Sequence, residues 1–195
     1  MLGSIPPVTR WLLILNVGIF LLGMVGIEPL LINWFALWPL DGPFAPWQLV
    51  SYSFLHGSYL HLFFNMFGIY MFGSEIERHI GARRFLEVYF TSVVIAAVAQ
   101  LIVTSYIFPS PYPTLGASGG LFGVLLAFGL LFPQRRIMLL IPPIPMKAWV
   151  FVTLYGLLEL GLGFSRAQTG VAHFAHLGGM LGGFLALRNL QRRRF

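Results

Sequence analysis

The feature that most constrains this chain is a series of long apolar segments that hold very few charged residues. A helix that crosses a bilayer needs roughly 20 mostly apolar residues, within a range of about 17–25. Six segments approach or exceed this length, at residues 11–27, 59–80, 85–108, 117–132, 148–164 and 171–187. The pattern predicts an all-α membrane protein, a bundle of six transmembrane helices.

Composition supports a membrane protein and limits its chemistry. Hydrophobic residues make up 57% of the 195 residues and charged residues 9%, whereas soluble domains carry about 25% charged residues. Because the predicted helices leave little chain for a separate soluble domain, we expect a single membrane domain over residues 1–195. The chain contains no cysteine, which excludes disulfides, thiolate nucleophiles and cysteine-based metal sites.

The basic residues predict the orientation of the bundle. With a cytoplasmic N-terminus, every lysine and arginine except Arg166 falls on the cytoplasmic side: Arg10, Arg78, Arg83, Arg84, Arg135, Arg136, Lys147, Arg188, Arg192, Arg193 and Arg194. Lys and Arg concentrate in cytoplasmic loops, so both termini are expected in the cytoplasm, with the protein in the plasma or inner membrane. Spread over four cytoplasmic ends, the charge forms no single stripe of the kind that binds nucleic acid, and no nucleic-acid partner is expected.

Three of the predicted helices bring polar side chains to one depth. The second, fourth and sixth run from outside to inside, and their first turns carry His61 and Asn65, Ser118, and His173 and His176, respectively. Residues 61 and 65 are four apart and share a helix face. A serine at a helix N-terminus has free backbone N–H groups beside it that suit an oxyanion, and a histidine within reach could take its proton. This arrangement favours a serine nucleophile with a histidine base, at a site that opens on the extracytoplasmic side.

The acidic residues favour a Ser–His dyad over a triad. They are Glu28, Asp41, Glu75, Glu77, Glu87 and Glu159. Most lie in loops or in the inner parts of the predicted helices, so no acid is expected at the level of Ser118. Glu159 lies inside the fifth apolar segment, where we expect it to bond a neighbouring helix or face a cavity rather than take part in chemistry.

Structural interpretations of the same residues compete with the chemical one. A serine among glycines in a membrane helix is commonly a packing residue, and an asparagine can simply bond a neighbouring helix. Ionisable groups within the bilayer, by contrast, indicate function by default. Because three helices place such residues at one depth, the functional interpretation is favoured.

Glycines predict that the fourth and sixth helices pack closely. Small residues spaced along one face let helix backbones approach each other in membranes. The fourth helix has Gly119 and Gly123, and the sixth has Gly178, Gly179, Gly182 and Gly183. Contact between these faces would bring Ser118 to His176.

The motifs that carry these residues resemble those of the rhomboid family of intramembrane serine proteases. HLFFN at His61–Asn65, GASG at Gly116–Gly119 and AHLGG at Ala175–Gly179 match the family patterns H-x-x-x-N, G-x-S-G and A-H followed by glycines. They occur in the same order and on the same helices, and the resemblance covers nearly all six predicted helices.

The resemblance implies a role for each site residue. Ser118 would be the nucleophile and His176 the general base, while His61, Asn65 and the Ser118 backbone N–H would form the oxyanion hole. Gly116 and Gly119 would support the serine, and Phe122 stands where some relatives have an aromatic ring stacked on the base. His173 lies one turn before His176 and competes for the role of base, but the AHLGG match favours His176.

The resemblance further implies an endopeptidase that cuts transmembrane segments of other membrane proteins near their outer ends, without a metal or other cofactor. The expected partners are transmembrane protein substrates and the lipid bilayer. A catalytically silent rhomboid-like protein that binds clients is the main alternative, and a small transporter is another, although no inverted halves are apparent. A metal-dependent membrane protease would draw on His56, His61, His173 and His176, but no H-E-x-x-H motif is present and no carboxylate lies near them in sequence.

Overall fold

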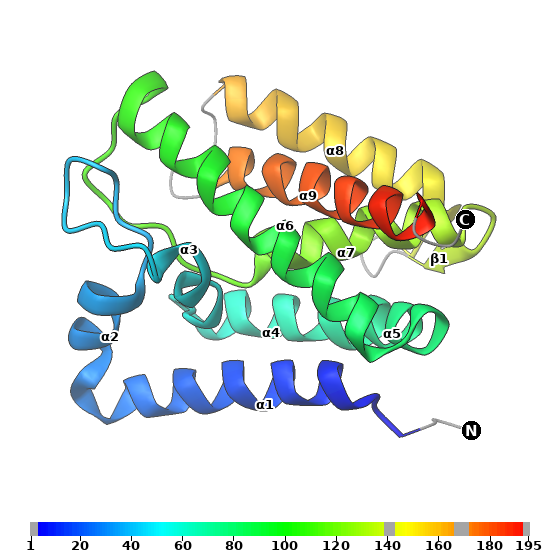
Figure 1. The fold of residues 1–195 in the computed structure, drawn as a ribbon, viewed down its shortest axis with the longest axis horizontal. Coiled ribbons are helices and arrows are strands. Elements are labelled where there is room, and N and C mark those ends of the chain that lie inside the picture. Colours follow the sequence, from blue (N-terminus) through cyan, green and yellow to red (C-terminus); the bar gives the residue numbers. More distant parts are fainter. Residues whose placement is uncertain (1–3, 139–142, 166–171, 193–195) are drawn as a thin grey trace.

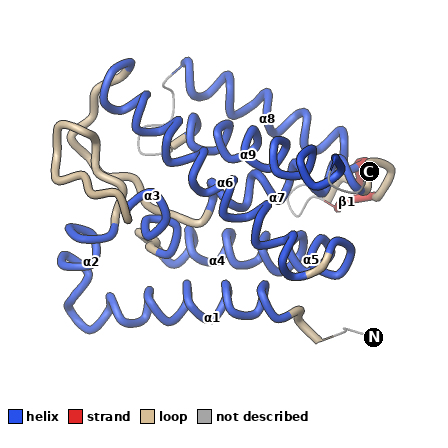
Figure 2. Tube along the Cα trace, viewed as in Figure 1, coloured by secondary structure: helices blue, strands red, loops and turns tan. Residues whose placement is uncertain are grey.

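The computed structural model describes residues 4–138, 143–165 and 172–192 and forms a bundle of helices (Figures 1 and 2). Its α-helices are α1 (Pro7–Leu22), α2 (Glu28–Phe35), α3 (Gln48–Ser51), α4 (Tyr59–Gly68), α5 (Ser74–Ile80), α6 (Ala82–Ile102), α7 (Ser118–Leu131), α8 (Ala148–Ser165) and α9 (His173–Arg192). Three π-helical segments, Gly23–Ile27, Ile69–Gly73 and Val103–Ile107, join or extend these helices, and Tyr52–Phe54 forms one 3₁₀ turn. The short strands β1 (Arg136–Met138) and β2 (Pro145–Lys147) pair antiparallel, with Ile137 opposite Met146.

The helices confirm a mostly helical membrane bundle, with shifted ends. Three helical stretches, Pro7–Phe35, Ala82–Ile107 and Ala148–Ser165, are long and apolar enough to cross a membrane, and α7 is a shorter apolar helix. The first predicted segment is broken before its end at Gly26, where φ is +94°. The last helix continues to Arg192 rather than ending near residue 187. Its final turns are polar, so an apolar pattern alone ends too early.

Helix α7 lies at the centre of the bundle against α6 and α9, and glycines make the contact possible. A Cβ added to Gly179 would overlap the carbonyl oxygen of Gly119, and one added to Gly183 would overlap that of Gly123. On the opposite side, a Cβ on Gly120 would lie 2.6 Å from the ring of Tyr89 on α6. The predicted close approach of the fourth and sixth helices is therefore present, with backbone touching backbone.

A single methyl group at this crossing is expected to destabilise the bundle. In Gly179→Ala the new methyl overlaps the Gly119 carbonyl, and overpacking of this kind costs about 1–3 kcal/mol. Gly161→Ala is the matched control, because nothing lies within 4 Å of a Cβ added there. Unfolding measurements in mixed micelles should show a lower free energy of unfolding for Gly179→Ala and an unchanged one for Gly161→Ala. Equal stability of the two variants would contradict the tight crossing.

The first turn of α1 is held by a side chain from α5. The buried carboxylate of Glu77 accepts hydrogen bonds from the backbone N–H groups of Val8 and Thr9, at 2.9 and 2.7 Å, and from the Thr9 hydroxyl at 2.8 Å. The first N–H groups of a helix have no partner within it, and a negative charge there is favourable. Glu77 thus caps α1 and ties it to the bundle.

The two ends of the bundle differ in charge. The start of α1, the α5–α6 turn, the strand pair and the end of α9 lie together at one end, and α7 and α9 begin inside the bundle on the side of its other end, where α2 lies (Figure 1). Within the described ranges, all lysines and arginines belong to the first of these ends: Arg10, Arg78, Arg83, Arg84, Arg135, Arg136, Lys147, Arg188 and Arg192. Arg166, Arg193 and Arg194 lie outside the described residues. Which end faces the cytoplasm stays a prediction.

Candidate active site

Ser118 is the first residue of α7, and the backbone before it depends on a glycine. Gly116 has φ of +129°, a conformation that side chains other than hydrogen rarely allow. A Cβ at Gly116 would also lie 2.7 Å from both Cε1 and Nε2 of His61. The backbone N–H of Gly116 donates to the carbonyl oxygen of Tyr52 at 3.0 Å, which fixes the entry to α7. Gly116 therefore allows the imidazole of His61 to lie close to the start of α7.

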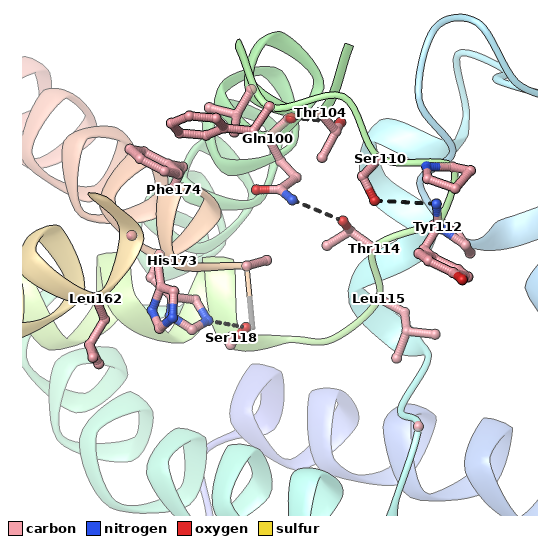
Figure 3. A pocket seen from close by; sticks show the side chains of 18 of the residues that line it. Gln100, Thr104, Ser110, Tyr112, Thr114, Leu115, Ser118, Leu162, His173 and Phe174 are labelled. Carbon is pink, nitrogen blue, oxygen red and sulfur yellow. Dashed lines mark hydrogen bonds between the residues drawn. The ribbon is translucent and has the colours of Figure 1, made fainter. Parts of the chain in front are cut away.

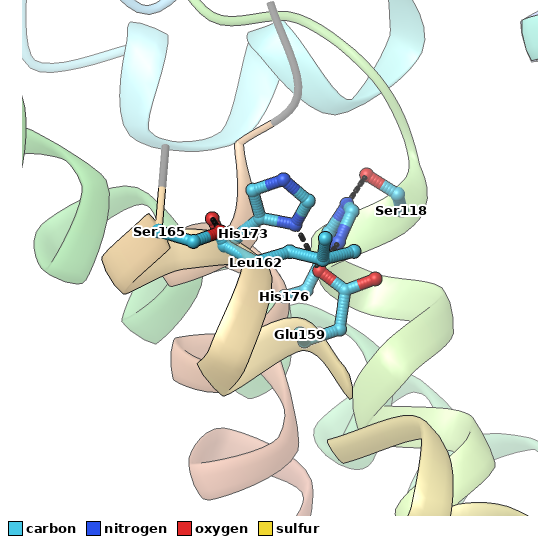
Figure 4. Close-up of polar contacts among 6 residues, drawn as sticks. All are labelled: Ser118, Glu159, Leu162, Ser165, His173 and His176. Carbon is cyan, nitrogen blue, oxygen red and sulfur yellow. Dashed lines mark hydrogen bonds and ion pairs between the residues drawn. The ribbon is translucent and has the colours of Figure 1, made fainter. Parts of the chain in front are cut away.

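Ser118 and His176 are in direct contact. The Oγ of Ser118 and the Nε2 of His176 are 2.9 Å apart, from α7 and α9 respectively (Figure 4). The Nδ1 of His176 lies 2.8 Å from Oε2 of Glu159 on α8, and the Nδ1 of His173 lies 2.7 Å from the same oxygen. Both histidines and Glu159 are buried. The residues form a continuous chain of hydrogen bonds from a serine hydroxyl to a buried carboxylate.

The expectation that no acid reaches the level of Ser118 is wrong. Helices α8 and α9 are antiparallel, so the C-terminal part of α8 lies level with the first turns of α9. Glu159 is six residues before the end of α8 at Ser165, a distance of roughly 9 Å along the helix axis at about 1.5 Å per residue. Its carboxylate extends toward His173 and His176, which are three residues apart and share one face of α9.

The imidazole of His176 is also held from its face. The ring of Phe122 on α7 stacks on it with centroids 4.1 Å apart and planes 5° from parallel. Tyr155 on α8 also stacks on Phe122, with ring centroids 5.4 Å apart and planes at 19°. The aromatic contact expected for Phe122 is present, and the column adds Tyr155, which the sequence alone did not indicate.

The two remaining predicted residues differ in their placement. His61 lies in the cavity wall with Ser118 and His176, and its ring packs edge-on against His56, with centroids 5.0 Å apart. Asn65 is buried, and its side-chain N–H donates to the backbone carbonyl of His61 at 3.0 Å. Asn65 is not among the residues that line the cavity around Ser118. In this structure its amide therefore bonds the backbone of its own helix, α4.

A cavity of about 980 Å³ adjoins Ser118 at the start of α7 (Figure 3). Its wall combines the starts of α4, α7 and α9, the ends of α6 and α8, and the loop of residues 108–115. Polar groups on this wall include Gln100, whose side-chain N–H donates to the Thr114 hydroxyl at 3.2 Å. The volume is large enough for several residues of an extended peptide and for water.

Glu159, His173 and His176 also form a possible ligand set for a metal ion. One ligand atom from each lies within 4.8 Å of the others, and a carboxylate with two imidazoles suits Zn²⁺. The separations of 2.7 and 2.8 Å between the ring nitrogens and Oε2 are hydrogen-bond lengths. Of the four histidines considered for a metal site, His56 and His61 are not part of this set.

The fold and the site together define a helical membrane protein in which a half-buried serine contacts a buried histidine beside a cavity. A family model described as the Rhomboid domain matches residues 43–193. The chain therefore belongs to the rhomboid family, and its apolar helices agree with an integral membrane protein.

Three relatives illustrate the similarity. Rhomboid protease GluP of Bacillus subtilis is 32% identical over 140 residues, which cover 72% of this chain and 25% of GluP. Rhomboid protein 1, mitochondrial, of Saccharomyces cerevisiae is 32% identical over 146 residues, 71% of this chain and 40% of that protein. Rhomboid protease GlpG of Yersinia pestis is 28% identical over 188 residues, 92% of this chain and 61% of GlpG. The chain thus spans less than two thirds of each of these relatives.

Proposed function

We propose that this protein is an intramembrane serine endopeptidase in which Ser118 is the nucleophile and His176 the general base. The observation that carries the proposal is the 2.9 Å contact between Ser118 Oγ and His176 Nε2 beside the cavity. A nucleophile and a base within hydrogen-bond reach, with the base oriented by a third group, are the signature of covalent acyl transfer. Membership in a family whose relatives include named proteases supports the same activity.

The reaction follows from this geometry. Ser118 Oγ attacks the carbonyl carbon of the substrate while its proton passes to Nε2 of His176, and the carbonyl electron pair moves onto the oxygen. As the C–N bond breaks, the leaving amine takes that proton. A water molecule then attacks the acyl ester and gives a proton to Nε2, which returns it to Ser118 Oγ when the new carboxylate leaves.

The oxyanion formed in the first step requires donors near the start of α7. The backbone N–H of Ser118, at the positive end of α7, is one donor. His61 supplies the second, because it lines the same cavity wall and lies close to Gly116. Asn65 would contribute through its second side-chain N–H, because the amide group has two donors and the His61 carbonyl takes one of them. Gly116 leaves room for the His61 ring, and Gly119 lets α7 pack closely against its neighbours. Phe122 holds the His176 ring by stacking on it.

The substrates of this site are transmembrane segments of other membrane proteins, reached from the lipid bilayer. A folded helix satisfies its own backbone hydrogen bonds, so the segment must unwind before Ser118 can attack. The site lies at the end of the bundle opposite the described lysines and arginines. With those residues in the cytoplasm, the cavity opens on the extracytoplasmic side of the cell membrane, and cleavage falls near the outer end of the substrate.

The proposal is tested with the purified protein in liposomes together with a model transmembrane substrate. Cleavage that persists with a metal chelator, and covalent labelling of Ser118 by a fluorophosphonate, are the expected results. Substrate binding without either cleavage or labelling would instead support a catalytically silent client-binding protein. Cleavage that the chelator abolishes would overturn the serine mechanism in favour of a metal-dependent one.

A further inference from the structure

Glu159 is a buried carboxylate whose contacts have no counterpart in a simple Ser–His dyad. Its residue is 6% exposed, and within the described part of the chain its nearest polar partners are the two ring nitrogens of His173 and His176. An unpaired charge in an apolar interior is costly, so such groups are paired and hydrogen-bonded. Two N–H donors converging on Oε2 provide that pairing.

The direction of these hydrogen bonds follows from the chemistry of the groups. An ionised carboxylate only accepts hydrogen bonds, and a neutral imidazole has one N–H and one acceptor nitrogen. Because Nδ1 of His176 faces Oε2 of Glu159 at 2.8 Å, Nδ1 carries the proton. Nε2 is then the acceptor, and it faces Ser118 Oγ at 2.9 Å. This is the tautomer that a general base at this position requires.

We infer that Glu159 is a positioning residue that completes a Glu159–His176–Ser118 relay, which rests on the proposed protease function. Its carboxylate fixes the Nδ1–H tautomer of His176 and stabilises the imidazolium that forms when Ser118 gives up its proton. Glu159 stays ionised throughout and takes no proton from His176. The interaction strengthens as positive charge develops on the ring, because a buried site screens charge less than water does.

Two further contacts hold the side chains of Glu159 and His176 in position relative to each other. His173 Nδ1 lies 2.7 Å from the same Oε2 and gives that oxygen a second hydrogen-bond partner. Tyr155 is one turn before Glu159 on α8 and stacks on Phe122, which stacks on His176. Helix α8 therefore fixes the edge of the imidazole directly and its face through Phe122. The Nε2 of His173 has no hydrogen-bond partner among the described residues. His173 therefore bonds Glu159 through Nδ1 and makes no hydrogen bond to Ser118 there.

The experiment compares wild type with Glu159→Gln and Glu159→Asp, measuring kcat, KM and the unfolding temperature in the liposome assay. The half-buried Glu75, which pairs with Arg135 at 3.2 Å, supplies the matched control Glu75→Gln. We expect Glu159→Gln to lower kcat by about 100-fold or more with KM unchanged, as happens when the acid behind a catalytic histidine is lost. Glu159→Asp keeps the charge and should recover part of the loss, whereas Glu75→Gln should match wild type.

Histidine-selective ¹⁵N NMR provides a readout that does not depend on turnover. We expect His176, assigned by its absence from His176→Ala, to show a protonated Nδ1 in wild type and to lose that signature in Glu159→Gln. A role confined to packing would lower the unfolding temperature of Glu159→Gln without changing the tautomer. That result, or wild-type kcat in Glu159→Gln, would overturn the inference.

These experiments also distinguish a failure of the Glu159 relay from a failure of the proposed protease function. Wild-type protein that shows the Nδ1–H signature but cleaves no substrate and reacts with no fluorophosphonate would overturn the protease function alone. Purified protein that contains about one metal ion per chain, lost together with activity in Glu159→Gln, would overturn the relay and assign the Glu159, His173 and His176 cluster to metal binding. A metal-free protein with the expected kcat and NMR changes supports the relay.

Discussion

Ser118→Ala is expected to abolish cleavage of a transmembrane substrate, with kcat falling by on the order of 10⁴-fold or more. In the proposed mechanism the hydroxyl oxygen forms the acyl bond, so no neighbouring group can replace it, and only water attack assisted by the oxyanion donors would remain. Product formation over hours, compared at equal protein concentration in liposomes, measures the loss. Labelling by a fluorophosphonate should disappear together with cleavage.

The fold should survive this change, which separates lost chemistry from lost structure. Among the described residues, the hydrogen-bond partner of the Ser118 hydroxyl is His176, and removing such a bond costs about 1 kcal/mol. Ser92→Ala is a matched control, because Ser92 is buried on α6 and its hydroxyl bonds the backbone of its own helix at Val88. Full activity in Ser92→Ala with none in Ser118→Ala is the expected pair of results. Undiminished cleavage by Ser118→Ala would remove the serine mechanism.

His176→Gln should reduce kcat nearly as far as Ser118→Ala. Glutamine fills much of the imidazole volume and can still contact Ser118, but it cannot accept a proton at neutral pH. If nucleophile and base act as a unit, the double variant should be no slower than Ser118→Ala alone. Initial cleavage rates of the three variants measure this directly.

His173→Gln is the control that distinguishes the two histidines. The nearest polar atom to Nδ1 of His173 is Oε2 of Glu159, and a glutamine amide can still donate to that oxygen. We expect kcat to stay within about tenfold of wild type, because the hydrogen bond to the Glu159 carboxylate is kept. If His173→Gln inactivated the protein while His176→Gln did not, His173 would be the base and the assignment of His176 would be wrong.

Much of this protein could be predicted from local sequence. An apolar segment in a membrane forms a helix whatever its neighbours in the bundle are, because its backbone polar groups must bond within the segment. The glycines of the fourth and sixth helices predicted the crossing that brings Ser118 to His176, since small residues at regular spacing mark a close backbone contact whatever the rest of the fold. The position of Ser118 at a helix start followed from the beginning of the fourth apolar segment at residue 117.

Only the tertiary structure revealed the surroundings of the histidine. Glu159 is 17 residues from His176, on another helix, and no sequence spacing relates the two. Their contact depends on the antiparallel arrangement of α8 and α9 and on how far each helix extends. The sequence also could not show that the Asn65 amide bonds the His61 carbonyl, because an asparagine on a helix can bond its own backbone or turn to a neighbour.

The sequence by itself therefore determined the helical membrane fold, the family and the serine–histidine pair. The tertiary structure decided that the carboxylate of Glu159 contacts His176 and that the rings of Phe122 and Tyr155 stack beside it. The physical reason is that helix formation and close glycine packing depend on residues near one another along the chain. A hydrogen bond between side chains of different helices depends instead on the relative position of those helices to within about an ångström.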